Sequence, residues 1–247
     1  MDWKKIVAEL FPQGHQIVES AQMLTGTAQV DHQLCQVIGT TAHTAIGVEI
    51  ALAQANAVLS ALRTGAQYPL LLLVDTKGQR LRRRDEVLGI NRYMAHLGKC
   101  LQLAREQGRK VVALVYDQAL SGGFVSSGMM ADACYALPGA RIWVMDLPAM
   151  ARITKMPEEQ LAALAINNPV FASGPHHFEK MGAIEAIWYG ELATKLRAAF
   201  TNIDQVDRRS ESGVHRGGRL VAQKVINAIL SIPESVFTIR NDACHAE

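Results

Sequence analysis

Apolar and polar residues alternate along this chain with two different periods, and together these predict an α/β fold. Two runs, 70–75 (LLLLVD) and 111–116 (VVALVY), are almost continuously apolar, which is typical of strands buried on both faces of a sheet. Apolar residues at helical spacing occupy 48–62 and about 87–106, and each of these segments ends near a glycine. Strands and helices in this order favour parallel pairing with right-handed crossovers.

Shorter elements are expected around this centre. The apolar residues of the first ten positions share one helical face, so we expect 1–30 to be a helical extension that precedes the first strand. No linker divides the chain, which predicts a single domain over 1–247 with a helical C-terminal part over 191–247. The pattern also predicts strands at 33–38, 133–137 and 141–145, and helices at 161–166, 183–189 and 219–230.

Composition and charge exclude several functional classes. Lysine and arginine number 25 against 23 acidic residues, and a net charge of +2 gives no electrostatic reason to expect a nucleic-acid partner. No unbroken apolar run approaches the roughly 20 residues that a membrane span requires, so no membrane association is expected. The N-terminus lacks the apolar core of a secretory signal, which favours a cytoplasmic protein.

The distribution of cysteine and histidine gives no sign of a metal or disulfide framework. The adjacent His176 and His177 would point apart on either a strand or a helix, so we expect ordinary surface or loop residues. The chain has no Walker loop, dinucleotide fingerprint, metal-spaced cluster or biotin-accepting lysine motif, so no bound cofactor is expected. The cysteines form no C-x-x-C pair and suit a reducing cytoplasm; they are Cys35, Cys100, Cys134 and Cys244.

Two glycine-containing turns carry the candidate chemistry. Asp75-Thr76-Lys77-Gly78 ends one buried strand, and Ser121-Gly122-Gly123 lies between the next buried strand and a helix. Glycines at such positions either permit a tight turn or let backbone N–H groups approach a ligand without an intervening Cβ. Because ligands of parallel sheets gather at the carboxyl ends of strands, we expect the two turns to be adjacent. Their amides would then form one oxyanion hole.

The residues around these turns resemble a known family. DTKG, then KVVALVYDQALSGGF, then ADACYALPGARIWVM is similar to the central unit of acyl-coenzyme A carboxyltransferases with the crotonase fold. The longer run SGGFVSSGMMADACYALPGARIWVMDLPAMARITK, followed by AINNPVFASGPHHFEKMGAIEAIW, resembles the gamma subunit of biotin-independent malonate decarboxylase. The resemblance covers about residues 30 to 235. It implies a crotonase-like spiral of ββα units with added C-terminal helices.

The resemblance also implies an activity and partners. In that family the gamma subunit pairs with a homologous beta subunit, and the pair decarboxylates malonyl carried on an acyl carrier protein to acetyl. An acyl-transferase alpha subunit completes the complex, and the pantetheine arm lies mainly on the partner subunit. No biotin, metal or nucleophile is needed, because backbone amides stabilise the enolate formed when carbon dioxide leaves.

Four residues of the two glycine turns are the candidate site residues. They are Gly78, Ser121, Gly122 and Gly123. Carboxyltransferase relatives usually carry proline where this chain has Lys77, and a denser glycine run before the helix, so the donor amide is either Gly122 or Gly123. The acid that protonates the enolate is either a side chain or water. The candidate side chains are Tyr116 and Ser121.

Two other functions fit parts of the pattern. Ser121 could be the nucleophile of a serine hydrolase, because Ala119-Leu-Ser-Gly-Gly123 is a relaxed nucleophile elbow. The base would then be His176, His177 or His215, and Asp146 or Asp204 would orient it. Against this, DQAL separates the serine from its strand and no H-G-G-G motif precedes it. A non-catalytic scaffold subunit that completes a partner's fold is the other alternative.

A cluster of three arginines, Arg82, Arg83 and Arg84, follows the first glycine turn. It is either a solvated loop at the start of a helix or a rim that meets an acidic carrier protein or a phosphopantetheine phosphate. The acidic residues Asp85 and Glu86 come directly afterwards and favour the start of a helix.

Overall fold

The computed structural model describes residues 1–168, 171–204 and 206–233, and its centre is one mixed sheet. In the described residues nine strands form this sheet in the order β1-β2-β3-β5-β6-β7-β9, while β4 pairs with β5 and β8 with β6. The strands are β1 (Val18–Ser20), β2 (Met23–Val30), β3 (Gln33–Thr40), β4 (Thr44–Ile46), β5 (Leu70–Gln79), β6 (Val111–Leu120), β7 (Ala133–Ala136), β8 (Arg141–Trp143) and β9 (Ala186–Ile187).

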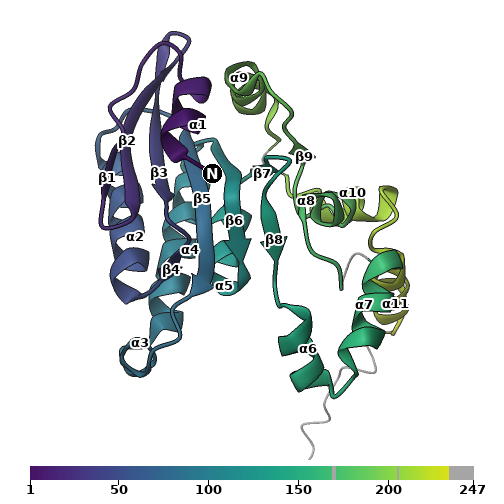
Figure 1. Cartoon of the computed structure of the whole chain (residues 1–247). Helices are drawn as coiled ribbons and strands as arrows, with labels where there is room; N and C mark the ends of the chain where they lie inside the picture. Colours follow the sequence, from purple (N-terminus) through teal and green to yellow (C-terminus); the bar gives the residue numbers. More distant parts are fainter. Residues whose placement is uncertain (169–170, 205, 234–247) are drawn as a thin grey trace, which may run out of the picture.

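Helices cover both faces of the sheet. In Figure 1, α2 and α4 lie behind the central strands, α1 and α9 lie on the opposite face, and α6, α7 and α11 stand beyond β8. The helices are α1 (Trp3–Leu10), α2 (Val48–Arg63), α3 (Arg83–Val87), α4 (Ile90–Glu106), α5 (Ser121–Val125), α6 (Leu147–Thr154), α7 (Glu158–Asn167), α8 (Pro175–Lys180), α9 (Leu192–Asn202), α10 (Arg209–His215) and α11 (Leu220–Leu230), with a 3₁₀ turn at Gly128–Met130.

The buried apolar runs explain this layering. Alternate side chains of β5 enter opposite cores: Leu72 packs with α2 and α4, whereas Leu71 packs with α1 and α9. The strands β3, β5, β6 and β7 are parallel, and each step of the chain moves one strand across the sheet. The predicted parallel α/β centre is therefore confirmed.

Two expectations about regular structure are wrong. The region 1–30 is not wholly helical, because after α1 it forms β1 and β2, which pair antiparallel, and β2 also pairs antiparallel with β3. The segment 183–189 is not a helix, since it contains β9 at the edge of the sheet beside β7. β2 is rich in small and polar residues and β9 is only two residues long, so neither strand has the continuous apolar run that marks β5.

Within the described residues, the part of the chain after 191 holds the helices α9, α10 and α11. Residues 234–247, including Cys244, lie outside the described residues. The other three cysteines are buried free thiols, and burial raises the pKa of Cys134 to about 12. Among the described residues, every helix is too short or too polar to span a lipid bilayer.

Candidate functional site

The first glycine segment is part of a strand rather than a turn. β5 continues through Asp75 to Gln79, with an irregularity in its pairing to β6 between Val74 and Thr76. Gly78 has a φ of 94°, which side chains rarely adopt, so the strand can take this path only with glycine there. The continuous apolar run ends at Val74, and for this reason the sequence predicted a turn and not a strand over the following residues.

The second glycine segment begins the short helix α5. β6 includes the residues DQAL, which were expected to form a connecting loop, and α5 starts immediately afterwards at Ser121. Ser121 has a φ of 48°, an uncommon left-handed conformation for a residue other than glycine. This sharp change of direction brings the two following glycines back towards β5.

The two glycine segments are in direct contact. A Cβ added to Gly123 would lie 2.9 Å from the carbonyl carbon of Gly78 and 3.0 Å from Cγ1 of Ile46 in β4. Real Cβ atoms do not approach a backbone this closely, so Gly123 is required by the packing itself. The prediction that the two segments meet at adjacent strand ends is confirmed.

The backbone amides of the two segments are engaged differently. The Gly78 N–H donates to the Thr76 hydroxyl at 3.1 Å, and this hydroxyl donates in turn to the Thr44 carbonyl at 2.7 Å. The Gly122 N–H instead donates to the side-chain oxygen of Gln79 at 3.0 Å, and Gln79 is only partly buried. An amide held by a movable side-chain oxygen is available to another oxygen, whereas the Gly78 amide is committed within its own strand.

The side chains considered for serine chemistry are not brought together by their hydrogen bonds. Ser121 Oγ donates to the Val144 carbonyl at 2.5 Å. Asp146 caps the N-terminus of α6 through the Ala149 N–H, and Asp204 pairs with Arg208. The candidate bases lie on α8 and α10; they are His176, His177 and His215. The described contacts therefore give Ser121 no activating base.

Tyr116, a candidate acid, is fully buried on β6. Its hydroxyl donates to the Thr40 carbonyl at 2.9 Å, and burial raises its pKa above the usual range of a phenol. The Tyr116 hydroxyl proton therefore forms a hydrogen bond inside the protein and does not face a substrate.

The arginine cluster after β5 is tied into ion pairs within the chain. Arg82 Nε lies 2.7 Å from the buried carboxylate of Asp85, and this contact lowers the pKa of Asp85. Asp85 also accepts the N–H of Val48 at 3.1 Å, so it caps α2. Arg84 pairs with Glu49 and lowers the pKa of that carboxyl. Arg82 and Arg84 remain exposed at the start of α3 and pair with carboxylates at the start of α2, which agrees with a solvated segment at a helix start.

A charged cluster with two buried carboxylates lies at the same end of the sheet and was not anticipated. His43 Nε2 is 3.5 Å from Asp75 Oδ1 and 3.2 Å from Asp117 Oδ2, and both carboxylates are buried. The signal was available, because Asp75 and Asp117 each directly follow a continuous apolar run, and the corresponding ends of neighbouring parallel strands share one edge. Among the described residues this is the one grouping close enough to hold a metal ion.

The surroundings of this cluster fit ion pairing better than a metal. The guanidinium of Arg141 lies 3.3 Å from His43 Nε2 and 3.8 Å from Asp117 Oδ1, and the N-terminal ammonium of Met1 also contacts Asp117. These positive charges already compensate the two carboxylates and would repel a cation. We therefore assign no metal to His43, Asp75 and Asp117.

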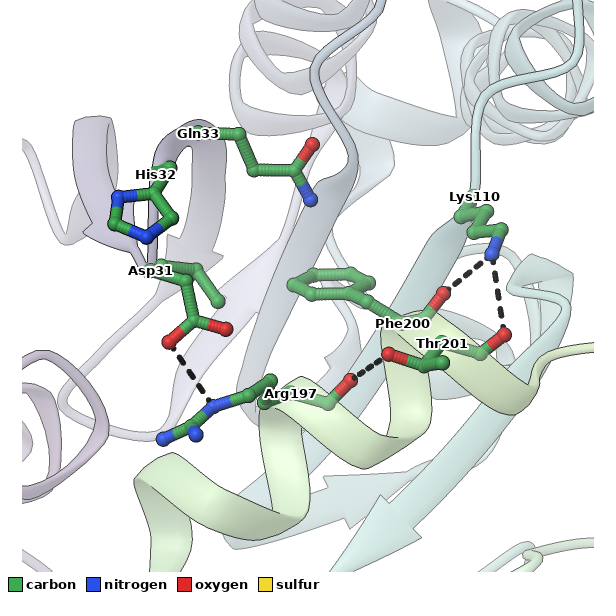
Figure 2. Close-up of a pocket in the computed structure, with 8 residues that line it drawn as sticks. Asp31, His32, Gln33, Lys110, Arg197, Phe200 and Thr201 are labelled. Carbon is green, nitrogen blue, oxygen red and sulfur yellow. Dashed lines mark hydrogen bonds and ion pairs between the residues drawn. The ribbon is translucent and has the colours of Figure 1, made fainter.

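A hollow of about 440 Å³ lies at the opposite, amino end of the parallel strands. Figure 2 shows its walls, formed by the β2–β3 hairpin, by Lys110 before β6 and by α9. Lys110 Nζ donates to the Phe200 carbonyl at 2.6 Å and to the Thr201 carbonyl at 3.3 Å, while Arg197 pairs with Asp31 at 3.1 Å. The cations here serve the C-terminus of α9 and the hairpin, so nothing in this hollow points to a ligand.

Comparison with known protein families identifies relatives along most of the chain. The family model described as malonate decarboxylase gamma subunit matches residues 41–232. The malonyl-S-ACP:biotin-protein carboxyltransferase of Malonomonas rubra is 29% identical over 237 residues, covering 82% of this chain and 81% of the relative.

Solved structures share the fold. A Pseudomonas malonate decarboxylase hetero-tetramer, crystallised with coenzyme A, matches with a TM-score of 0.74 and 22% identity over 91% of this chain and 97% of the relative. Transcarboxylase 12S, with hydrolysed methylmalonyl-coenzyme A bound, matches with a TM-score of 0.67 and 19% identity, over 82% of this chain but 40% of its own chain. The expected crotonase-like carboxyltransferase fold is confirmed.

Proposed function

Because the chain belongs to the malonate decarboxylase gamma subunit family, we propose that it is one half of a heteromeric enzyme that decarboxylates a malonyl thioester. The substrate is malonyl on an acyl carrier protein, and the product is the acetyl thioester. The relative from Malonomonas rubra, named for malonyl-S-ACP, supports this substrate class.

The observation that carries the proposal is the contact between the glycine segments of β5 and α5. Loss of carbon dioxide from a malonyl thioester leaves an enolate, whose oxygen needs rigid hydrogen-bond donors. The Gly122 N–H already holds an oxygen, that of Gln79, at 3.0 Å. We assign this amide as the donor that this chain supplies, with the thioester oxygen taking the place of the Gln79 oxygen.

The other candidate residues have supporting roles in this mechanism. Gly123 lets α5 lie against β5, and Gly78 lets β5 take the path that meets it. Ser121 holds the start of α5 through its bond to Val144. Since Tyr116 is buried, the proton that converts the enolate to the acetyl group comes from water or from the partner subunit.

A second subunit completes the site. The chain corresponds to 40% of the transcarboxylase 12S chain, so that relative carries additional chain beyond this unit. In this protein the homologous beta subunit would supply the other half and most of the pantetheine-binding surface. The acyl carrier protein and an acyl-transferase alpha subunit complete the proposed complex.

The buried free thiols of Cys35, Cys100 and Cys134 suit a reducing cytoplasm.

Co-expression with the beta subunit tests the proposal. The purified pair, and each subunit alone, would be assayed for conversion of malonyl to acetyl on carrier protein and on coenzyme A. We expect activity from the pair and from neither subunit alone, unaffected by avidin or a chelator. Full activity of the beta subunit alone would make this chain a scaffold, and full activity of this chain as a monomer would exclude a half-site.

A further inference from the structure

The charged cluster of His43, Asp75, Asp117 and Arg141, here named the His43 cluster, joins two buried carboxylates to two partly exposed basic side chains, and the proposed reaction does not use it. Asp75 is 2% exposed and Asp117 is 8% exposed. Two buried carboxylates this close to one imidazole are costly unless positive charges or hydrogen-bond donors face them. Asp75 Oδ1 has no hydrogen-bond partner; the His43 imidazole lies 3.5 Å from it, and the Tyr116 hydroxyl also interacts with this carboxylate.

His43 engages Asp75 through its backbone as well as its side chain. The His43 N–H donates to Asp75 Oδ2 at 3.0 Å, while the ring lies between Asp75 and Asp117. Ala42 and His43 have φ values of 56° and 48°, so two successive non-glycine residues are left-handed. Such backbone is strained and persists only where the surroundings hold it. The contacts of His43 with β5 and β6 are what hold this loop.

The loop leads directly into β4, which touches both glycine segments. Thr44 follows His43, and its carbonyl accepts the hydroxyl of Thr76, the same hydroxyl that accepts the Gly78 N–H. At the other end of β4, Ile46 packs against Gly123, with Cγ1 3.0 Å from the position of an added Cβ. A displacement of the loop would therefore move the surface on which both segments rest.

We propose that His43 is a positioning residue: its contacts with Asp75 and Asp117 clamp β4 against β5 and so fix the contact between the Gly78 and Gly123 segments. The clamp rests on the proposed function only for its effect on turnover. Its structural part, the hold on β4, is independent of the reaction.

The test compares three variants of the full chain, each assembled with the beta subunit. His43→Phe keeps the size of the ring but removes both nitrogens, and His43→Gln keeps near the position of Nε2 an amide that can donate to a carboxylate or accept from Arg141. His32→Gln is the control, because His32 is exposed at the rim of the hollow at the amino end. If His43→Phe does not fold, His43→Ala replaces it, since the vacated space lets water reach the carboxylates.

We expect His43→Phe, or His43→Ala, to lower kcat about tenfold with KM within about twofold, because misplaced donors weaken transition-state binding more than substrate binding. His43→Gln should restore kcat to within about threefold of the wild type, and His32→Gln should change nothing. Wild-type kcat in the apolar variant, or no recovery in His43→Gln, would overturn the proposal.

Amide hydrogen exchange of 75–79 in the full chain provides a readout that needs no activity. We expect faster exchange in His43→Phe or His43→Ala than in the wild type, and near wild-type exchange in His43→Gln. If the wild-type complex does not decarboxylate malonyl thioesters, the proposed function fails while this measurement still decides the clamp. Unchanged exchange in the apolar variant would overturn the clamp even in an active enzyme.

Discussion

The two ends of the central sheet differ in how their polar groups are used. At the amino end, the hollow beside α9 is large, yet Lys110 and the pair of Arg197 with Asp31 stabilise a helix end and a hairpin. At the carboxyl end of β5 and β6 the backbone is irregular, with Gly78 and Ser121 in left-handed conformations. Asp31 at the amino end is also left-handed, with a φ of 51°, so the ends differ in how their polar groups are engaged and not in backbone conformation alone.

The difference teaches that the size of a hollow is a poor guide to the site in this chain. The carboxyl end is built around an amide whose acceptor, the Gln79 oxygen, can be replaced by that of a ligand. At the amino end, the cations that line the hollow already pair with groups of this chain. The following predictions separate the two ends, beginning with the largest expected effect.

Gly123→Val should lower turnover of the assembled complex about a hundredfold or more, the usual cost of losing an oxyanion donor. Any side chain at 123 collides with the backbone of Gly78, so the helix must move away from β5. Steady-state assays measure the loss, after gel filtration has established that the variant still joins the beta subunit. An assembled variant with near wild-type turnover would remove the glycine contact from the mechanism.

Asp85→Asn should lower the free energy of unfolding by about 1–2 kcal/mol at neutral pH, because the charge facing Arg82 and the N-terminus of α2 is lost. The pKa of Asp85 is lowered in the folded chain, so its contribution is present above the ordinary carboxyl pKa and is lost as pH falls through the folded value. Urea titrations at several pH values should therefore show the wild type and the variant converging in acid. A difference that stays constant would contradict the ion pair.

Ser121→Ala should retain most turnover, with a loss of about tenfold at most, since one neutral hydrogen bond is worth about 1 kcal/mol. The hydroxyl bonds to the Val144 carbonyl and not to a base. The same assay as for Gly123→Val gives the ranking of the two variants. A dead Ser121→Ala complex beside an active Gly123→Val complex would favour the serine hydrolase instead.

Lys110→Met should leave turnover within about twofold of the wild type while lowering the free energy of unfolding by about 1 kcal/mol. The ammonium group holds the last carbonyls of α9 and faces no part of the proposed site. Thermal unfolding and the decarboxylation assay measure the two quantities separately. A large loss of turnover with unchanged stability would move the active region to the amino end.

The sequence predicted the fold best where every residue of a strand or helix face is buried in the same kind of surroundings. Leu71 and Leu72 lie in a strand buried on both faces, and their continuous apolar run predicted a central parallel strand correctly. Gly78 and Gly123 were also placed together correctly, because the carboxyl ends of adjacent parallel strands must meet.

The remaining features depend on contacts that no local pattern encodes. β2 has mixed burial and only small or polar residues between Leu24 and Val30, so it was mistaken for part of a helical extension. The burial of Asp85 beside Arg82 could not be predicted, because a run of charged residues indicates a solvent-exposed segment. His43 lies in an unremarkable stretch of small residues, and only the folded chain brings it between Asp75 and Asp117.

The central claim is that the Gly122 amide, at the carboxyl end of the sheet, receives the thioester oxygen. The most direct measurement follows the backbone amide signals of Gly122 and of His32 by NMR as a malonyl thioester analogue that cannot lose carbon dioxide is added to the assembled complex. The account predicts a saturable shift of the Gly122 signal that Gln79→Ala reaches at lower analogue concentration, while the His32 signal stays in place. A complex that binds the analogue with the Gly122 signal unchanged, or with the shift confined to His32, would contradict it.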